Sequence, residues 1–284
     1  MDSARPRFSL YIVSTPIGNL KDLSPRAQET LQNVDYILSE DTRRARKIKS
    51  RFSLTAPLVS LHEHNEKARI PKIISLMKNG KKFALISDAG TPLLSDPGFL
   101  LVREMIEQRL PVTYIPGPNA VIAALLLSGL PTQPFTFYGF LPQQEGRRKE
   151  ILRSLVSLNQ TLIFFESPER VLGFLRELGE EFGDRDAALC REMTKLHEEV
   201  QRGKISTLLS TFAERKIRGE FTIVIGPPSK EFSVVAMTEE TILARYKQLQ
   251  TDGYSRKEAL KKLTKESGRS RNELYRLFLS DRDS

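Results

Sequence analysis

Short apolar runs alternate with longer amphipathic stretches from Phe8 to Ile115. Each apolar run is rich in aliphatic, β-branched and aromatic residues and ends at turn-forming residues, which is typical of a buried strand. The strands predicted in this way are Phe8–Val13, Tyr36–Leu38, Leu58–Leu61, Phe83–Ile86 and Val112–Ile115. Because strands that alternate with helices favour a parallel sheet with helical crossovers, we predict an N-terminal α/β domain over residues 1–117.

The same alternation restarts after a strongly apolar helix predicted at Val121–Leu127. This helix is apolar on nearly every side, so we expect it to be buried between two halves of the protein. The strand-like runs beyond it are Phe135–Tyr138, Thr161–Phe165, Ala187–Cys190 and Phe221–Ile225. They predict a second α/β domain over residues 118–228, and Pro227–Lys230 has the composition of a linker.

The chain changes character after Met237, where charged residues become frequent. Ile242, Leu243, Tyr246 and Leu249 recur at helical spacing. Ser255 and Glu258 form a capping-box pattern, and the same Ser-x-x-Glu signature returns at Ser270–Glu273. We therefore predict a C-terminal helical hairpin over residues 238–284 that resembles a helix-turn-helix, with a solvated hairpin without a ligand as the alternative.

Three of the predicted strands end in loops rich in small residues, glycine and proline. These loops are Thr15–Leu20, Ser87–Pro92 and Pro116–Ala120. Since the carboxyl ends of parallel strands meet at one edge of a sheet, the loops should form a crevice where open α/β sheets bind ligands. Asp88 can accept hydrogen bonds from hydroxyls or amines, and Gly90 allows the backbone to approach a flat ligand. Ordinary turns use the same residue types, so it is the recurrence of three such loops that favours a nucleoside-like ligand.

Composition and charge narrow the range of partners. Hydrophobic residues make up 39% and charged residues 28% of the chain, which is ordinary for a globular protein. The longest apolar run, Ala120–Leu127, is too short to span a bilayer, and Met1–Arg7 has no signal-peptide pattern. We therefore expect a cytoplasmic protein with no membrane partner. A formal net charge of +9 favours a polyanionic partner, although a polycarboxylate small molecule would also suit a basic cleft.

A metal site is not predicted. His62 and His64 lie two residues apart, which is a poor arrangement for shared coordination without further ligands. The one other histidine, His197, is distant in the sequence. Polar contact with a substrate or a loop is the favoured interpretation of these side chains.

Several segments, taken together and in order, resemble one family. They are Leu10–Leu20, Glu40–Arg43, His62–Glu66, Ile86–Gly98, Pro116–Pro118, Ser128–Pro131, Gly139–Pro142 and Arg191–Lys195. In these segments the chain resembles the ribosomal RNA small subunit methyltransferase I group of the tetrapyrrole methylase superfamily. The resemblance implies a class III methyltransferase fold of two α/β domains, with S-adenosyl-L-methionine (SAM) in the cleft between them. It also implies a homodimer that methylates the ribose 2′-hydroxyl of a cytidine in the decoding region of 16S ribosomal RNA.

The loops and the resemblance together indicate site residues. The residues expected to bind the cofactor are Pro16, Gly18, Asp88, Ala89, Gly90, Pro92, Asn119 and Ala120. Those expected to act in catalysis are Glu40, Glu192 and Lys195. Those expected to contact RNA are Arg43, Arg191 and Arg271. A ribose hydroxyl is a weak nucleophile that needs a proton acceptor, and the sequence leaves that acceptor open among Glu40, Asp41, Asp88, Asp96, Glu192 and Lys195.

Two positions depart from the family pattern. Asn119 stands where the family usually has serine, and Glu169 stands where it usually has histidine. Neither the glycine-rich motif of common Rossmann-type methyltransferases nor a phosphate-binding P-loop is present in the sequence. A precorrin-type tetrapyrrole methylase and a non-catalytic RNA-binding relative are the alternative functions. The basic C-terminal segment and the Glu40–Arg43 motif favour RNA over a tetrapyrrole.

Overall fold

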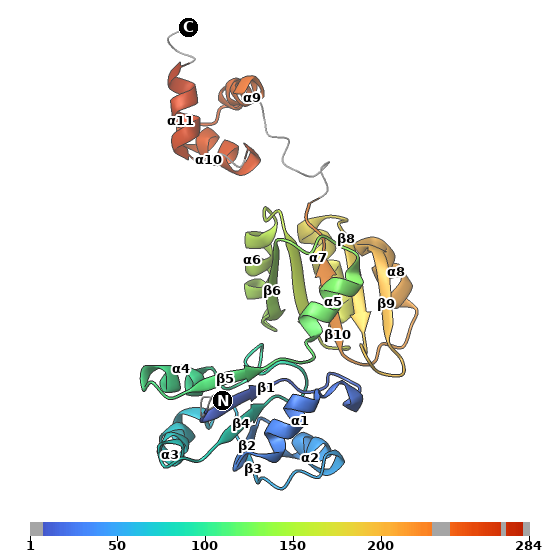
Figure 1. Ribbon diagram of the computed structural model, residues 1–284. Coiled ribbons are helices and arrows are strands. Elements are labelled where there is room, and N and C mark those ends of the chain that lie inside the picture. Colours follow the sequence, from blue (N-terminus) through green and yellow to red (C-terminus); the bar gives the residue numbers. More distant parts are fainter. Residues whose placement is uncertain (1–7, 229–238, 268–270, 281–284) are drawn as a thin grey trace, which may run out of the picture. The chain divides into compact units, whose positions relative to one another are not determined.

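The computed structural model of the chain describes residues 8–228, 239–267 and 271–280 (Figure 1). Its contacts divide the chain into two compact units. The first unit comprises Met1–Leu155 and Gln160–Gly226, and the second comprises Val156–Asn159 and Pro227–Ser284. Within the described ranges, no helix is both long enough and apolar enough to cross a membrane. Both sheets thus belong to one unit, and the division into three domains stays a prediction.

The first sheet holds five strands in the order β3-β2-β4-β1-β5, and every neighbouring pair is parallel. Its strands are β1 (Leu10–Val13), β2 (Tyr36–Ser39), β3 (Leu58–Ser60), β4 (Phe83–Ile86) and β5 (Val112–Ile115). Its helices are α1 (Pro25–Gln32), α2 (Thr42–Arg51), α3 (Glu66–Lys78) and α4 (Phe99–Glu107), with a short 3₁₀ helix at Leu20–Asp22. The predicted parallel sheet with helical crossovers is confirmed, with strand ends within a residue or two of those expected.

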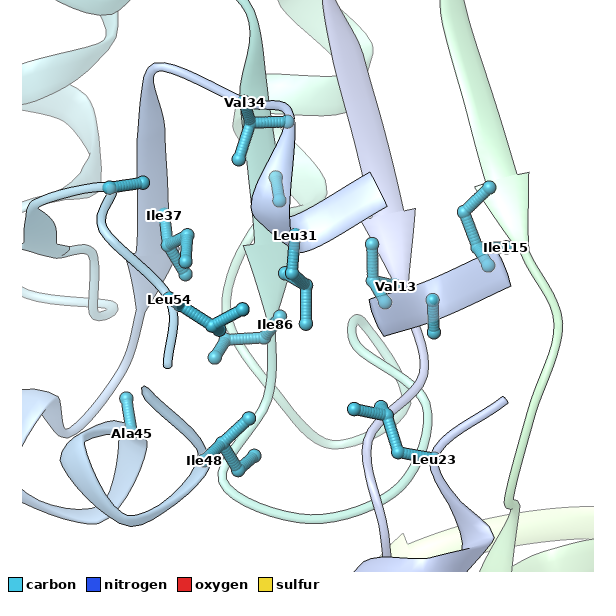
Figure 2. Close-up of a cluster of buried hydrophobic side chains, with 13 residues drawn as sticks. Val13, Leu23, Leu31, Val34, Ile37, Ala45, Ile48, Leu54, Ile86 and Ile115 are labelled. Carbon is cyan, nitrogen blue, oxygen red and sulfur yellow. The ribbon is translucent and has the colours of Figure 1, made fainter. Parts of the chain in front are cut away.

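Helices cover both faces of this sheet. Successive side chains of a strand point to opposite faces, so one strand contributes apolar residues to the packing on each side. Ala84 and Ile86 of β4 pack with α1 and α2 in one apolar cluster (Figure 2). Phe83 and Leu85 pack with α3 and α4 in a second cluster. Burial on both sides explains why β4 is a continuous apolar run and not an alternating one.

The second sheet has the order β6-β7-β10-β8-β9 and is mostly antiparallel: β6 with β7 is its one parallel pair of neighbouring strands, and its other three neighbouring pairs are antiparallel. Its strands are β6 (Phe135–Phe140), β7 (Thr161–Glu166), β8 (Asp186–Arg191), β9 (Glu199–Lys204) and β10 (Phe221–Ile225). Its helices are α5 (Ala120–Ser128), α6 (Glu145–Leu155), α7 (Val171–Phe182) and α8 (Ile205–Ala213). The four strands predicted for this half are confirmed, and with them the alternation of strands and helices.

Two features of this half differ from expectation. Strand β9 was not predicted, because its sequence EVQRGK is polar and an edge strand needs little burial. Helix α5 was expected to be buried between two halves, and that is wrong. Val121, Ala124 and Leu125 pack on the second sheet, whereas Ile122 and Leu126 expose 43% and 68% of their surface. Although α5 is apolar all round, only one of its faces is packed on the second sheet, and the other is exposed in the monomer.

The second unit is helical and has its own small core. It contains α9 (Glu239–Thr251), α10 (Arg256–Ser267) and α11 (Arg271–Ser280), one helix more than a hairpin. Ile242, Leu263, Leu274 and Phe278 are buried together in it. The Ser255–Glu258 capping box is confirmed, since the Ser255 N–H donates to Glu258 Oε2 at 2.9 Å and the Glu258 N–H donates to Ser255 Oγ at 3.4 Å. The second predicted signature begins at Ser270, which lies outside the described residues.

A buried glutamate stabilises the N-terminus of α4, the helix that follows the loop after β4. Glu66 lies at the start of α3 with 4% of its surface exposed, and its Oε1 accepts a hydrogen bond of 2.9 Å from the Leu101 N–H. Leu101 is in the first turn of α4, whose preceding residue Gly98 has φ of 116° and provides no side-chain cap. Glu66 thus supplies from another helix the acceptor that α4 lacks at its own N-terminus.

We predict that Glu66→Ala lowers the free energy of unfolding by about 1–3 kcal/mol, because it leaves the buried Leu101 N–H without an acceptor. Glu66→Gln keeps an acceptor oxygen and should cost less. Glu63→Ala, at an exposed position three residues earlier, is the matched control and should change stability by no more than about 0.5 kcal/mol. Urea unfolding of the three variants measures this, and equal stabilities of Glu66→Ala and Glu63→Ala would contradict the capping role.

Candidate functional site

Three loops meet at the carboxyl edge of the first sheet, as the sequence predicts. Thr15, after β1, and Gly90, after β4, form two backbone hydrogen bonds of 2.8 and 3.0 Å. Asn119, before α5, donates from Nδ2 to Thr91 Oγ1 at 3.0 Å, and Thr91 Oγ1 donates to the Pro118 carbonyl at 3.2 Å. The loops after β1, β4 and β5 are therefore locked to one another by direct contacts.

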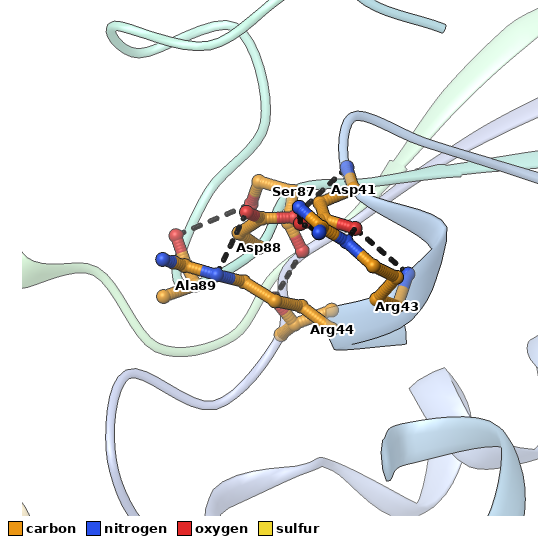
Figure 3. A network of polar contacts seen from close by, with 7 residues as sticks. Asp41, Arg43, Arg44, Ser87, Asp88 and Ala89 are labelled. Carbon is orange, nitrogen blue, oxygen red and sulfur yellow. Dashed lines mark hydrogen bonds and ion pairs between the residues drawn. The ribbon is translucent and has the colours of Figure 1, made fainter. Parts of the chain in front are cut away.

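A fourth loop, between β2 and α2, is attached to the same edge (Figure 3). The Asp41 N–H donates to Asp88 Oδ1 at 3.2 Å, and Arg44 Nε lies 3.5 Å from Asp88 Oδ2. Asp41 caps α2 by accepting from the Arg43 N–H at 2.8 Å, and it pairs with the Arg43 guanidinium. These contacts of Arg43 hold the pKa of Asp41 down at about 2. Asp88 therefore positions the start of α2 beside the loop that the sequence identified.

The opposite wall comes from the second sheet. The Asn19 N–H donates to Thr194 Oγ1 at 3.1 Å, which joins the first loop to the loop after β8. A Cβ atom at Gly18 would lie 2.7 Å from the Met193 carbonyl oxygen and still closer to Lys195 Cγ, so only glycine fits this approach. A Cβ atom at Gly139 of β6 would likewise clash with Ser95 Oγ.

A cavity of about 430 Å³ lies between these walls, within the usual size of small-molecule sites. Asp88, Gly90, Asn119 and Ala120 line it from the first sheet and its loops. From the second sheet come Phe165, Glu166–Pro168, Glu192, Met193 and Glu220–Thr222. A larger groove of about 940 Å³ lies between α3 and α4 and shares no lining residue with this cavity.

Six carboxyl groups line this cavity, and three of them, Glu40, Asp88 and Asp96, come from the first sheet and its loops. Burial, and after it the charges of Glu40 and Asp88, raise the pKa of Asp96 to about 7. The pKa of Glu40 is raised by burial and then by Asp88. The pKa of Asp88 is raised by burial despite its hydrogen bond from Asp41. Such an environment favours a ligand that carries positive charge.

A charged cluster borders the other side of the cavity. Lys195 Nζ lies 2.8 Å from Glu192 Oε1 and 3.1 Å from Glu220 Oε2. Burial alone would raise the pKa of Glu192, but hydrogen bonds from Lys195 and from the Glu220 N–H bring the pKa below its ordinary value. Burial would lower the pKa of Lys195, yet its two glutamate partners raise it. Both side chains therefore stay charged at neutral pH. The lowered pKa makes Glu192 a weaker base than an ordinary carboxylate, and the raised pKa keeps Lys195 protonated.

Strained backbone gathers at the same place. Six described residues other than glycine have positive φ, and four of them lie in loops that border the cavity. Leu93 and Ser95 have φ of 73° and 68°, and Glu192 and Thr194 have φ of 50° and 64°. Left-handed conformations cost free energy in residues with a Cβ atom and occur preferentially at functional sites.

The structure brings together many, but not all, of the residues expected at the site. Those that line the cavity are Glu40, Asp88, Ala89, Gly90, Asn119, Ala120 and Glu192. Those that do not line it are Pro16, Gly18, Pro92, Lys195, Arg43 and Arg191. Arg191 instead contacts Glu199 and donates to the Arg218 carbonyl. Arg271 begins α11, but its side chain lies outside the described part of the chain.

Sequence reasoning assigned no role to several lining residues. Arg44, Phe140, Phe165 and Thr222 are examples, and Asp96 was considered only as a proton acceptor. Phe165 and Thr222 lie in strands of the second sheet, where an apolar run predicts burial but not which end faces a ligand. Arg44 directly follows Arg43, and its position became apparent only once α2 was placed against Asp88.

Comparison with known proteins agrees with this geometry. The family model of tetrapyrrole (corrin/porphyrin) methylases matches residues 9–209. The ribosomal RNA small subunit methyltransferase I of Thermotoga maritima is 48% identical over 76% of this chain and 97% of its own length. The same enzyme of Synechocystis is 41% identical over 95% of this chain and 97% of its length, and that of Bacillus subtilis is 41% identical over 94% and 92%. The chain belongs to the tetrapyrrole methylase family, in its ribosomal RNA small subunit methyltransferase I group.

Membership of the tetrapyrrole methylase family confirms the resemblance and the fold class predicted from the motifs, and it makes the chain a methyltransferase. Solved structures of the same fold are more distant in sequence. Diphthine synthase matches with a TM-score of 0.59 at 15% identity, over 76% of this chain and 89% of its own. A cobalt precorrin-4 methyltransferase matches with a TM-score of 0.58 at 17% identity, over 76% and 94%. Identities this low show the shared fold alone.

The raised pKa of Asp96 predicts a specific pH dependence of stability. Between the ordinary value of 3.8 and about 7, Asp96 is ionised in the unfolded chain and protonated in the folded one. The folded state then binds more protons, so its free energy of unfolding falls as the pH rises. Asp96→Asn removes this titration. We expect the melting temperature of the variant minus that of the wild type to increase from pH 4 to pH 7 and to be level above pH 7.

Thermal unfolding without ligand across this pH range measures the difference. Asp96→Glu keeps a titratable carboxyl group at the same site and should retain most of the dependence. A melting-temperature difference for Asp96→Asn that is constant from pH 4 to pH 8 would contradict the raised pKa.

Proposed function

We propose that the chain transfers a methyl group from SAM to the ribose 2′-hydroxyl of a cytidine in the decoding region of 16S ribosomal RNA. The observation that carries this proposal is the cavity at the edge of β1, β2 and β4, in a chain similar over nearly its whole length to small-subunit ribosomal RNA methyltransferases. The nucleotide and the hydroxyl are what the sequence motifs imply. Action on ribosomal RNA would place the protein in the cytoplasm.

The residues that face the cavity fit SAM. When bound, SAM supplies an activated methyl group on a positively charged sulfur. Asp88, Ala89 and Gly90 would hold it from the loop after β4, and Asn119 and Ala120 from the start of α5. Pro16, Gly18 and Pro92 would act by shaping the loops, since they do not line the cavity. The raised pKa values of Glu40, Asp88 and Asp96 support a cationic ligand, because a nearby positive charge would favour their ionised forms.

The remaining task of the chain is to orient the hydroxyl and remove its proton. Glu40 and Asp96 both line the cavity, and a raised pKa makes the ionised form of each a stronger base than an ordinary carboxylate. We therefore propose that the proton acceptor is one of these two. Glu192 and Lys195 would instead position the target nucleotide, since their mutual ion pair keeps both charged.

Exposed cations and exposed apolar residues suggest the partners. The Arg43 side chain, 84% exposed near the mouth of the site, would contact an RNA phosphate. We propose the same role, contact with an RNA phosphate, for Arg191 and Arg271.

Two exposed apolar residues support a homodimer that covers them: Leu126 of α5 is 68% exposed and Phe99 of α4 is 61% exposed.

The proposed function is tested with methyl-labelled SAM and undermethylated small ribosomal subunits. Transfer of label to a ribose of 16S RNA is the expected result. Label transfer to a precorrin but not to RNA would favour the tetrapyrrole methylase alternative. If neither SAM binding nor methyl transfer to any substrate is detected, the chain would be a non-catalytic RNA-binding relative.

Asp88 should be needed for SAM binding. We predict that Asp88→Ala weakens SAM binding at least about tenfold, or about 1.4 kcal/mol, because it removes a negative charge from the cavity and releases the Asp41 N–H. Asp35→Ala is the matched control. Asp35 also accepts a backbone N–H, that of Lys82 at 2.8 Å, but at the opposite end of the sheet. Calorimetric titration measures both, and equal affinities of the two variants would overturn the assignment.

The C-terminal unit should act on RNA and not on SAM. A chain ending at Met237 loses α9–α11 but keeps all the residues that line the cavity. We predict an unchanged SAM affinity, a raised KM for ribosomal subunits and a weaker salt dependence of KM, because fewer phosphate contacts release fewer counterions. The full-length Lys257→Ala/Lys261→Ala variant should show a smaller change in the same direction. Steady-state kinetics over a salt series measures this, and unaltered constants would show that the unit is a solvated appendage.

A further inference from the structure

Helix α2 carries six lysines and arginines among its ten residues and has no acidic residue. They are Arg43, Arg44, Arg46, Lys47, Lys49 and Arg51. Ala45 and Ile48 are buried against the sheet, so the cations occupy the remaining surface of the helix. Charge of one sign is thus concentrated on an element that begins at the candidate site.

This concentration is costly to the helix itself. Arg43, Arg44 and Arg46 lie in its first half, where the helix dipole favours negative charge. Arg43 and Lys47, and likewise Lys47 and Arg51, are spaced four residues apart, and like charges at this spacing destabilise a helix by a few tenths of a kcal/mol per pair. Helix stability therefore does not account for the pattern.

Contacts within the protein account for only some of the cations of α2. Arg43 pairs with Asp41, Arg44 lies 3.5 Å from Asp88, and Lys49 Nζ donates to the Ala56 carbonyl at 2.7 Å. Arg46 and Lys47 are exposed and make no hydrogen bond or ion pair with any residue that the structure describes. Arg51 is exposed too, and its guanidinium lies 5.7 Å from the centre of the Phe52 ring.

The cations follow a line away from the cavity. Arg44 lines the cavity, and Lys47 and Arg51 lie three and seven residues further along the helix, on the same side. At 1.5 Å per residue, this line extends about 10 Å from Arg44. It is continuous with the site, because Glu40 and Asp41 directly precede the helix and Asp41 is bonded to Asp88.

We propose that α2 is an RNA-docking surface that binds the phosphates of nucleotides flanking the one held in the cavity. This inference rests on the proposed function, since it takes the polyanion to be the RNA substrate. Arg46, Lys47 and Arg51 supply the phosphate contacts, whereas Lys49 stabilises the turn after the helix. Phosphate contacts fix the register of the RNA on the protein and leave the choice of base to the cavity.

The test compares two triple variants of the full-length chain with equal loss of charge. One is Arg46→Ala/Lys47→Ala/Arg51→Ala on α2. The control is Lys67→Ala/Lys72→Ala/Lys78→Ala on α3, which removes three exposed lysines from the opposite face of the same sheet. Both leave the cavity residues intact, so calorimetry should give the wild-type SAM affinity for each.

For the α2 variant, we expect the KM for undermethylated small subunits to rise at least tenfold at 0.15 M salt, with kcat unchanged. The slope of log KM against log salt should fall by about 2, because each phosphate contact to a single strand contributes about 0.7. The α3 variant should behave as the wild type. Equal kinetics of the two variants would overturn the proposal. So would an α2 variant that loses affinity for intact subunits but not for protein-free 16S RNA, since α2 would then bind a ribosomal protein.

Failure of the proposed function gives a different result. In that case the wild type itself would transfer no methyl group to small subunits, whatever the state of α2. A wild type that is active, together with two variants of equal KM, rejects the docking surface alone.

Discussion

The site depends on the pair of backbone hydrogen bonds between Thr15 and Gly90. They join the loop after β1 to the loop after β4, although the two residues are far apart in the sequence. Each loop alone is short and rich in residues that permit many conformations, so neither would hold a ligand by itself. The parallel pairing of β1 with β4 brings the loops to the same edge, and the two bonds then fix one against the other. Asn119 and Thr91 extend the same linkage to the start of α5.

Charge at the site is arranged in two opposed groups. Near the first sheet, burial raises the pKa values of Glu40, Asp88 and Asp96, and the charge of Asp88 raises those of Glu40 and Asp96 further, which makes the cavity receptive to a cation. Near the second sheet, Glu192 and Lys195 neutralise each other and stay ionised. Carboxyl groups of the same chemistry thus acquire different properties from their surroundings: the pKa of Asp96 is raised to about 7, whereas that of Glu192 lies below its ordinary value. Such a separation is what a site needs when it binds a cationic donor and also removes a proton from an acceptor.

Glycine and strained residues allow the two walls of the cavity to approach. Gly18 has no room for a Cβ atom against the loop after β8, and Gly139 has none against Ser95. The positive φ values of Ser95 and Glu192 lie on the two sides of the same space. The free energy stored in these conformations must be offset by the packing of the two sheets, which hold the loops from both ends. The site is therefore a product of the whole first unit.

The sequence by itself determined most of the elements, the edge of the sheet where a ligand would bind, and the family. Strands such as Phe83–Ile86 are continuous apolar runs because both faces are buried, and that pattern can be read without coordinates. The strand β9 could not be found in this way, since an edge strand made of polar residues leaves no apolar signal. The exposed face of α5 was missed for a related reason: hydrophobicity predicts that a surface will be covered, but not by what. Only the tertiary structure showed that Arg44 lies at the cavity and that Lys195 is an ion-pair partner, because such roles depend on distances between segments that local sequence does not encode.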